Sequence, residues 1–250
     1  NAYRAPGAPI AAHAVESTMD ELADKLGLDP VEFRLQNAAK EGSKAAYGPT
    51  FKKIGFVETL EAAKAHAHYS APLGPNQGRG VACGFWFNVG GESSAQLHIN
   101  EDGTATIITG HPDIGGSRAS MVNITAEMLG VDYRAVRAQI GDTNSIGISA
   151  TTGGSRVTFS AGMAVTQVTE KVITTLRERA ALIWEIDVEA VVWEDGEARP
   201  AGSNAGEFEP LSLGDLAAKA NATGGPINGQ VSINAQGAAP AFTTHVCDVE

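Results

Sequence analysis

Apolar residues recur every three to four positions in several stretches of the chain, which is the spacing of a helix that buries one face. In the first stretch they run from Ala12 to Leu26 and end at Gly27, a residue type common just after helices. Asp29-Pro30 then has the form of a cap and first turn for a second helix. The pattern predicts helices over residues 9–26, 30–39, 57–67, 117–130 and 157–182, and a short one after Ser212.

Shorter apolar or alternating runs predict strands over residues 80–89, 95–100, 104–109, 136–140, 190–193 and 242–250. Asp102-Gly103 and Asp195-Gly196 are turn dipeptides, and each predicts a hairpin. Because the elements do not alternate steadily between strand and helix, we expect an α+β fold with mixed helices and antiparallel-rich sheets. We expect a helical N-terminal segment over residues 1–78 and an α+β portion over residues 79–250.

Composition narrows the classes of protein that remain. The formal net charge is −11, from 18 basic and 29 acidic residues, and no basic stripe is present, which argues against a nucleic-acid partner. No apolar run is long enough to cross a membrane and no signal-peptide layout is visible, so we expect a cytoplasmic location. Cys83 and Cys247 lie in apolar, strand-like runs and are expected to be buried free thiols.

Both ends of the chain look truncated. It opens at Asn1 inside a loop rich in Pro and Gly and closes within a strand pattern, so we expect an internal piece of a longer polypeptide.

The tetrapeptide Gly-Gly-Ser-Arg occurs twice, at residues 115–118 and 153–156. Each copy stands where a strand and loop give way to a predicted helix. Glycines before a helix allow a concave array of amide donors, and serine and arginine add a hydroxyl and a planar cation, so each copy is suited to an anion such as phosphate. The alternative is structural: a tight loop, a serine cap and a solvated arginine. Both interpretations stay open on these residues alone.

Other signals are weaker. The six histidines show no metal-binding spacing, and neither a phosphate-binding Walker loop nor a nucleophile elbow is present. Phe85, Trp86 and Phe87 cluster three aromatic residues on one predicted strand, with Phe85 and Phe87 on the same face. They fit either the core or the wall of a pocket for a planar substrate.

Several motifs in register resemble one known family. They are Ala-Tyr-Arg-Ala-Pro-Gly-Ala-Pro at residues 2–9, the helical segment 16–37, Asp-Ile-Gly at 113–115, Gly-Asp-Thr at 141–143, and Thr-Gly-Gly-Ser-Arg at 152–156 continuing to Gly-Met-Ala at 162–164. In this order they resemble the molybdopterin-binding large subunit of the xanthine dehydrogenase/aldehyde oxidase family, the molybdenum hydroxylases. The resemblance covers most of residues 1–180.

The resemblance implies a molybdenum ion held by the dithiolene of a pterin, alone or as a cytosine dinucleotide. Such enzymes oxidise an aldehyde or an N-heterocycle with oxygen from water, and their electrons leave through 2Fe-2S clusters to FAD on partner subunits or domains. It also implies contact with the remainder of the large subunit and with a small-molecule substrate. The residues assigned to the cofactor are Tyr3, Arg4, Ala5, Gly115, Gly116, Ser117, Arg118, Ser120, Thr152, Gly153, Gly154, Ser155 and Arg156, and those assigned to the substrate pocket are Phe85 and Trp86.

The chain also departs from the family pattern. Gly116 stands where relatives usually have a glutamine near the metal's oxo ligand, and Ala5 stands where carbon monoxide dehydrogenases have a copper-binding cysteine. The family's general-base glutamate is expected outside this chain, so no catalytic residue and no direct metal ligand are assigned, and the isolated chain is expected to be inactive. Two alternatives remain. One is a non-enzymatic phosphoanion- or nucleotide-binding module, and the other is a degenerate paralogue that keeps the residues around the cofactor but does not catalyse the reaction.

Overall fold

The computed structural model describes residues 3–237 and 240–250, which form two compact units. Unit 1 holds residues 3–88 and 240–250, and unit 2 holds residues 89–237. We expected the first segment to end at residue 78. The two units are grouped differently, because the C-terminal strand returns to pair with the first strand. The predicted α+β class, with mixed helices and antiparallel-rich sheets, is confirmed.

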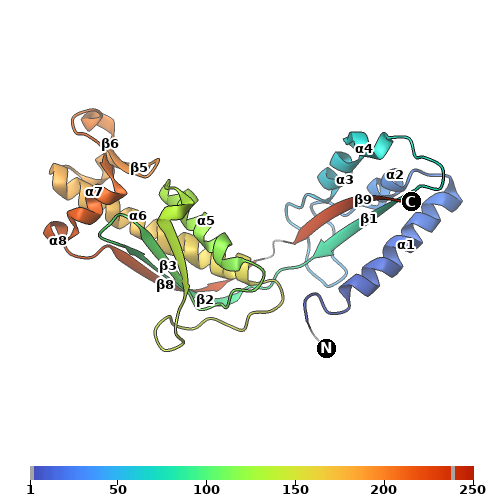
Figure 1. The fold of residues 1–250 in the computed structure, drawn as a ribbon, viewed down its shortest axis with the longest axis horizontal. Helices are drawn as coiled ribbons and strands as arrows, with labels where there is room; N and C mark the ends of the chain where they lie inside the picture. Colours follow the sequence, from blue (N-terminus) through green and yellow to red (C-terminus); the bar gives the residue numbers. More distant parts are fainter. Residues whose placement is uncertain (1–2, 238–239) are drawn as a thin grey trace. The chain divides into compact units, whose positions relative to one another are not determined.

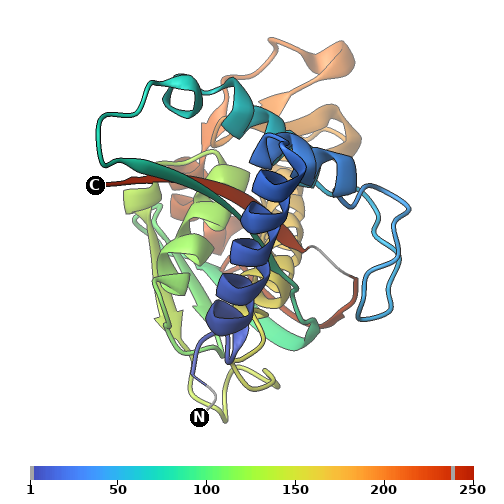
Figure 2. The ribbon, with the colours of Figure 1, turned by 90° about the vertical axis from the view of Figure 1, so that its right-hand side faces the viewer.

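Unit 1 is a two-stranded ribbon with helices packed against it. Strands β1 (Gly78–Trp86) and β9 (Ala241–Val249) run antiparallel, with Gly78 opposite Val249. The helices are α1 (Ala8–Leu26), α2 (Pro30–Asn37), α3 (Phe56–Ala65) and α4 (Ala67–Ser70). Helix α1 packs against β1 and α3 against β9 (Figure 1), and Figure 2 shows α1 crossing the ribbon. Because a ribbon of two strands is marginally stable alone, these helices supply its core.

The sequence signals for the first two helices act as predicted. Gly27 ends α1 with a φ of 65°, in the left-handed region. The Asp29 carboxylate accepts hydrogen bonds from the backbone amides of Val31 and Glu32, both at 2.9 Å, and Pro30 occupies the first turn of α2.

A buried arginine joins three elements of unit 1. Arg34, 3% exposed, donates from Nε to Glu16 Oε2 at 3.0 Å and from Nη1 to Asp20 Oδ1 at 2.7 Å. Its Nη2 also donates to the carbonyl of Val81 at 2.9 Å. One guanidinium on α2 therefore binds α1 and β1 together beside a small apolar core of Val31, Leu60 and Val81.

The main sheet of unit 2 has the order β4-β3-β2-β8. Its strands are β2 (Gly91–Ile99), β3 (Ala105–Thr109), β4 (Val136–Ile140) and β8 (Asn228–Ala235). The predicted hairpin of β2 and β3 is confirmed, and β2 also pairs antiparallel with β8. Strands β3 and β4 run parallel, and helix α5 (Ser117–Leu129) connects them, followed by the turn η1 (Tyr133–Ala135).

The core of unit 2 lies between this sheet and helix α6 (Gly162–Trp184), which packs on β2 and β8 (Figure 1). Val165, Val168, Val172 and Leu176 recur at helical spacing along α6 and are fully buried. Burying each such side chain contributes roughly 1.5–3 kcal/mol. The π-helical turn η2 (Val157–Ala161) precedes α6 and packs against α5 and β2.

A smaller three-stranded sheet completes unit 2. Its order is β5-β6-β7, and the hairpin predicted at Asp195-Gly196 joins the first two strands. Ser212 and Asp215 form a reciprocal capping box at the start of α7. The bounds of the remaining elements are η3 (Val188–Ala190), β5 (Val191–Glu194), β6 (Glu197–Pro200), η4 (Gly202–Asn204), β7 (Leu211–Ser212), α7 (Leu213–Ala218) and α8 (Ala220–Thr223).

One prediction about the cysteines is wrong. Both thiols are free, but Cys83 is half-buried and Cys247 is exposed. Successive residues of a strand point to opposite faces. Val246 packs against the small core of unit 1, so its neighbour Cys247 lies on the other face of the ribbon.

We predict that Arg34→Met destabilises the chain by about 3–5 kcal/mol, because Glu16 and Asp20 would lose their buried cation. Denaturant unfolding measures the change. Lys25→Met is the matched control, since the ion pair of Lys25 with Glu21 at 4.0 Å is exposed on both sides and its loss should have little effect. Equal stability of the two variants would show that the Arg34 cluster contributes nothing.

Candidate functional site

Two glycine-rich loops leave the same edge of the unit 2 sheet. Because β3 and β4 are parallel, with Thr109 opposite Ile140, their carboxyl ends lie side by side. Residues 110–116 follow β3, and residues 141–156 follow β4. Ligands of open α/β sheets bind beyond the carboxyl ends of parallel strands. This edge is therefore the candidate site, and each loop ends in one copy of Gly-Gly-Ser-Arg.

The first corner is built around Asp113. Gly115 and Gly116 have φ values of 70° and 86°, a region that glycine adopts without strain. The Asp113 carboxylate accepts from the Arg118 amide at 3.2 Å and from Arg118 Nε at 2.9 Å. It also accepts from Ser117 Oγ at 3.3 Å. Arg118 is thus paired with the Asp113 carboxylate, and its hydrogen bonds hold the pKa of Asp113 below its usual value. The Ser120 amide donates to the Gly116 carbonyl at 3.4 Å and closes the turn.

The second corner is held by Arg156, which is 3% exposed. Its Nε donates to the carbonyl of Gly90 at 2.9 Å, Nη1 to that of Ala150 at 2.6 Å, and Nη2 to that of Glu92 at 2.8 Å. The alternative of a solvated surface arginine is therefore wrong for Arg156. Its guanidinium joins the start of β2 to the loop after β4, and a direct contact with the cofactor stays a prediction.

Four glycine amides at the two corners are open to a ligand. Gly115, Gly116, Gly153 and Gly154 are all exposed. Within residues 3–237 and 240–250, their N–H groups donate to no acceptor of the chain. Such donors are satisfied by water or by an anion, and consecutive glycine amides are typical of anion-binding loops.

The two corners meet at a histidine. His111, the second residue after β3, is 2% exposed, and its Nδ1 lies 3.3 Å from Thr152 Oγ1 at the start of the second corner. Burial, with a contribution from the charge of Arg156, lowers the pKa of His111 and favours the neutral ring. The structure thus brings together two sequence motifs that are about 40 residues apart in the chain.

The predicted residues near the N-terminus lie in unit 1. Tyr3 is 82% exposed, and Arg4 and Ala5 have φ values of 47° and 44°. Successive non-glycine residues in this region are strained, and such strain is concentrated at functional sites. Their assignment to the cofactor stays a prediction.

Phe85 and Trp86 also lie in unit 1. The ring of Phe85 is 41% exposed and contacts Tyr47 and Phe242, with ring centroids at 5.8 and 5.2 Å. Phe87 contacts Tyr47 as well, which places Phe85 and Phe87 on one face as expected, and Trp86 stacks on Phe87 at 4.9 Å. This aromatic cluster is partly exposed, so the role of Phe85 and Trp86 as the wall of a substrate pocket stays a prediction.

Sequence reasoning missed the polar residues that support the corners. His111, Ser93 and Ser160 carry no motif spacing and become neighbours only through the fold of β2, β3 and η2. Asp113 offered a signal, because an acidic residue just before a helix commonly caps its first turn. Among the described residues, no group of three His, Cys, Asp or Glu side chains is arranged to hold a metal ion, and no helix has the length and apolar character that a membrane crossing requires.

Comparison with known families gives two matches of the same kind. Residues 49–250 and residues 1–38 each match a model described as a molybdopterin cofactor-binding domain.

Several curated relatives are similar to this chain. The aldehyde oxidoreductase molybdenum-binding subunit PaoC of Escherichia coli K12 is 33% identical over 231 residues, which are 88% of this chain and 30% of that protein. The putative xanthine dehydrogenase molybdenum-binding subunit XdhA of the same organism is 37% identical over 54% of this chain and 20% of its own length. The chain thus spans less than a third of the relatives it matches.

Solved structures share the fold. Carbon monoxide dehydrogenase from Oligotropha carboxidovorans superposes with a TM-score of 0.79 at 18% identity, covering 95% of this chain and 34% of that one. Quinoline 2-oxidoreductase from Pseudomonas putida 86 gives a TM-score of 0.75 at 21% identity, with the same coverage of both chains.

The two arginines of the repeated motif should differ in stability effect. We predict that Arg156→Met destabilises the chain by about 3 kcal/mol or more, because three backbone carbonyls would lose the hydrogen bonds that a buried cation donates to them. Arg118→Met should change stability little, because the Arg118 side chain is 55% exposed. Thermal unfolding of both variants measures the difference, and a fully stable Arg156→Met would contradict the clamp role.

Proposed function

The chain belongs to the molybdopterin cofactor-binding domain family, and we propose that it is one cofactor-binding part of a molybdenum hydroxylase large subunit. The complete subunit would oxidise an aldehyde or an N-heterocycle with oxygen from water. The names of the relatives support this substrate class, since they include an aldehyde oxidoreductase, a xanthine dehydrogenase subunit and a nicotine 6-hydroxylase subunit.

One observation carries the proposal: the four exposed glycine amides at the carboxyl edge of β3 and β4. Molybdopterin ends in a phosphate or a dinucleotide, and an array of amide donors fits such an anion. Gly115, Gly116, Ser117, Arg118 and Ser120 would hold one part of the cofactor. Thr152, Gly153, Gly154 and Ser155 would hold another part, with Arg156 supporting the loop from behind.

When bound, the cofactor supplies the molybdenum at which the substrate carbon is oxidised. The residues of this chain bind and orient it. Tyr3, Arg4 and Ala5 would lie near the outer ligands of the metal, and Phe85 and Trp86 would line the approach of the substrate. The proton-abstracting glutamate is expected in another part of the subunit, and 2Fe-2S and FAD groups on partner subunits or domains would receive the electrons. We propose a cytoplasmic complex.

Gly116 favours a second candidate, a degenerate paralogue that keeps the cofactor shell. It has a φ of 86° and carries no side chain where relatives usually have a glutamine. A glutamine placed there would be strained by this backbone conformation. The donor near the oxo ligand is therefore missing unless another residue supplies it.

Molybdenum analysis tests the cofactor assignment. We expect the full-length subunit to contain close to one molybdenum per chain. Arg118→Met should weaken cofactor binding on the order of tenfold to a hundredfold, the effect of losing one charge-assisted hydrogen bond. The control is Arg134→Met, because Arg134 is a 76% exposed arginine of unit 2 that lies over the Tyr133 ring. A subunit that binds nucleotides but no molybdenum would favour the phosphoanion-binding module instead.

The isolated chain should show no turnover. With molybdopterin and a panel of aldehydes and N-heterocycles added, we expect no product above the rate without protein, because the general base is expected elsewhere. The full-length subunit with its partners, assayed in parallel, is the positive control. Oxidation by the isolated chain would refute the assignment of the base to another region.

A further inference from the structure

A chain of buried hydrogen bonds runs through unit 2 behind the glycine corners. Thr152 Oγ1 lies 3.3 Å from His111 Nδ1, and His111 Nε2 lies 3.1 Å from Ser93 Oγ. Ser93 Oγ donates to Ser160 Oγ at 3.1 Å, and Ser160 Oγ donates to the Arg156 carbonyl at 2.8 Å. The path begins and ends on the same pentapeptide, residues 152–156.

The Arg156 carbonyl, at the end of this path, fixes the direction of three of its four bonds. A carbonyl only accepts, so the Ser160 hydroxyl donates its single proton to the Arg156 carbonyl. The Ser160 oxygen must then accept the hydrogen bond from Ser93. Ser93 then has no proton left for His111 and must accept from Nε2. The imidazole is therefore protonated at Nε2. Burial favours the neutral ring, and in that form Nδ1 accepts from the Thr152 hydroxyl. Of the two neutral tautomers of His111, only the Nε2–H form satisfies all four bonds.

The pentapeptide held by this path is strained. Gly154 and Ser155 have φ values of 65° and 57°, and the second is a conformation that residues with a side chain rarely adopt. Such a conformation persists only when its surroundings determine it. Here Thr152 is bound at one end, the Arg156 carbonyl at the other, and the Arg156 guanidinium is fixed by three carbonyls.

We propose that His111 is a positioning residue: as the neutral Nε2–H form it holds the Thr152–Arg156 corner in the conformation that binds the cofactor. It acts through Thr152 and Ser93 and needs no contact with the cofactor. The ring is 2% exposed, and Ser93 and Ser160 are fully buried, so water does not compete for the bonds among these three residues. The lowered pKa of His111 agrees with a neutral ring. The cofactor part of this inference rests on the proposed function.

The test uses the full-length subunit with three readouts. Nitrogen-15 NMR of labelled histidine rings should show His111 neutral and protonated at Nε2, and Thr152→Val should shift its Nδ1 resonance. The Ser160 amide donates to the Arg156 carbonyl and the Ala150 amide to the Glu92 carbonyl. Hydrogen exchange of these two amides should become about tenfold faster in His111→Phe and in Ser93→Ala, as for a corner that opens more often. Molybdenum content should fall in the same variants, and His111→Gln, which restores a donor and an acceptor, should recover part of both.

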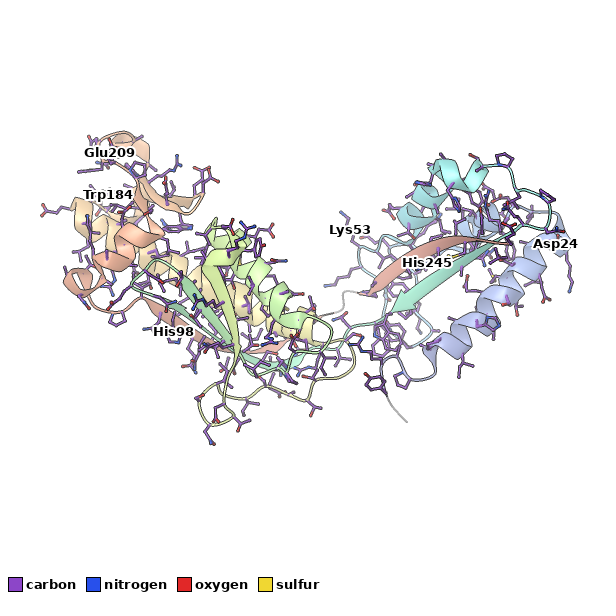
Figure 3. The ribbon with its side chains drawn as sticks, viewed as in Figure 1. Asp24, Lys53, His98, Trp184, Glu209 and His245 are labelled. Carbon is purple, nitrogen blue, oxygen red and sulfur yellow. The ribbon has the colours of Figure 1, made fainter. Side chains whose placement is uncertain are left out.

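His98→Phe is the matched control. His98 lies on β2 opposite Thr106, at the far end of the sheet from Ser93, and is labelled in Figure 3. This variant should leave molybdenum content and the exchange of the Ser160 and Ala150 amides unchanged. If His111→Phe does not fold, the inference is tested by hydrogen exchange and molybdenum content in Ser93→Ala and by the tautomer of His111 in the wild-type subunit.

Two results would overturn the inference: a His111 ring protonated at Nδ1, or unchanged exchange in both His111→Phe and Ser93→Ala. A wild-type subunit without molybdenum would instead overturn the proposed function. A loaded subunit whose variants keep both the metal and slow exchange would reject the positioning role alone.

Discussion

The candidate site depends on the buried guanidinium of Arg156. Its three acceptors are the carbonyls of Gly90, Glu92 and Ala150, which belong to the start of β2 and to the loop after β4. The planar guanidinium carries five donors in a rigid fork and can hold several backbone segments at once, whereas a lysine offers three donors on a flexible stem. Because the loop after β4 is long and irregular, these contacts fix where the second glycine corner begins. The exposed amides of Gly153 and Gly154 follow from that anchor.

Identical tetrapeptides serve different purposes in the two corners. Arg118 is exposed and pairs with Asp113, and the same carboxylate accepts from the amide of Arg118 in the first turn of α5. Arg156 is buried and binds backbone. What the corners share is the glycine pair, exposed and without an acceptor in the described part of the chain. The repeat thus encodes amide donors, and the surroundings decide what each arginine does.

Local sequence signals predicted most of the fold. The helical spacing before Gly27, the Asp29-Pro30 cap and the Asp102-Gly103 hairpin all depend on neighbours within a few residues, and each is present in the structure. The pairing of β1 with β9 and the link from Ser93 to His111 and Ser160 depend on residues far apart in the chain. Nothing in one sequence marks such neighbours. The buried role of Arg156 was missed for the same reason, because an arginine after a glycine pair equally suits a surface.

The difference between the two arginines also decides the electrostatics of the site. Arg118 pairs with Asp113 while its side chain stays 55% exposed, so the first corner offers amide dipoles together with a cation that a carboxylate partly screens. Within the described residues no carboxylate forms an ion pair with Arg156, and its neighbours are carbonyls, hydroxyls and a neutral imidazole. A buried charge acts through a lower effective dielectric than a solvated one. In a chain with a net charge of −11, the guanidinium of Arg156 is thus a buried positive charge behind the second corner, and it would favour the anionic cofactor that we propose without touching it. Burial and the charge of Arg156 both lower the pKa of His111, so the ring is neutral and Thr152 is the donor in its bond with Nδ1.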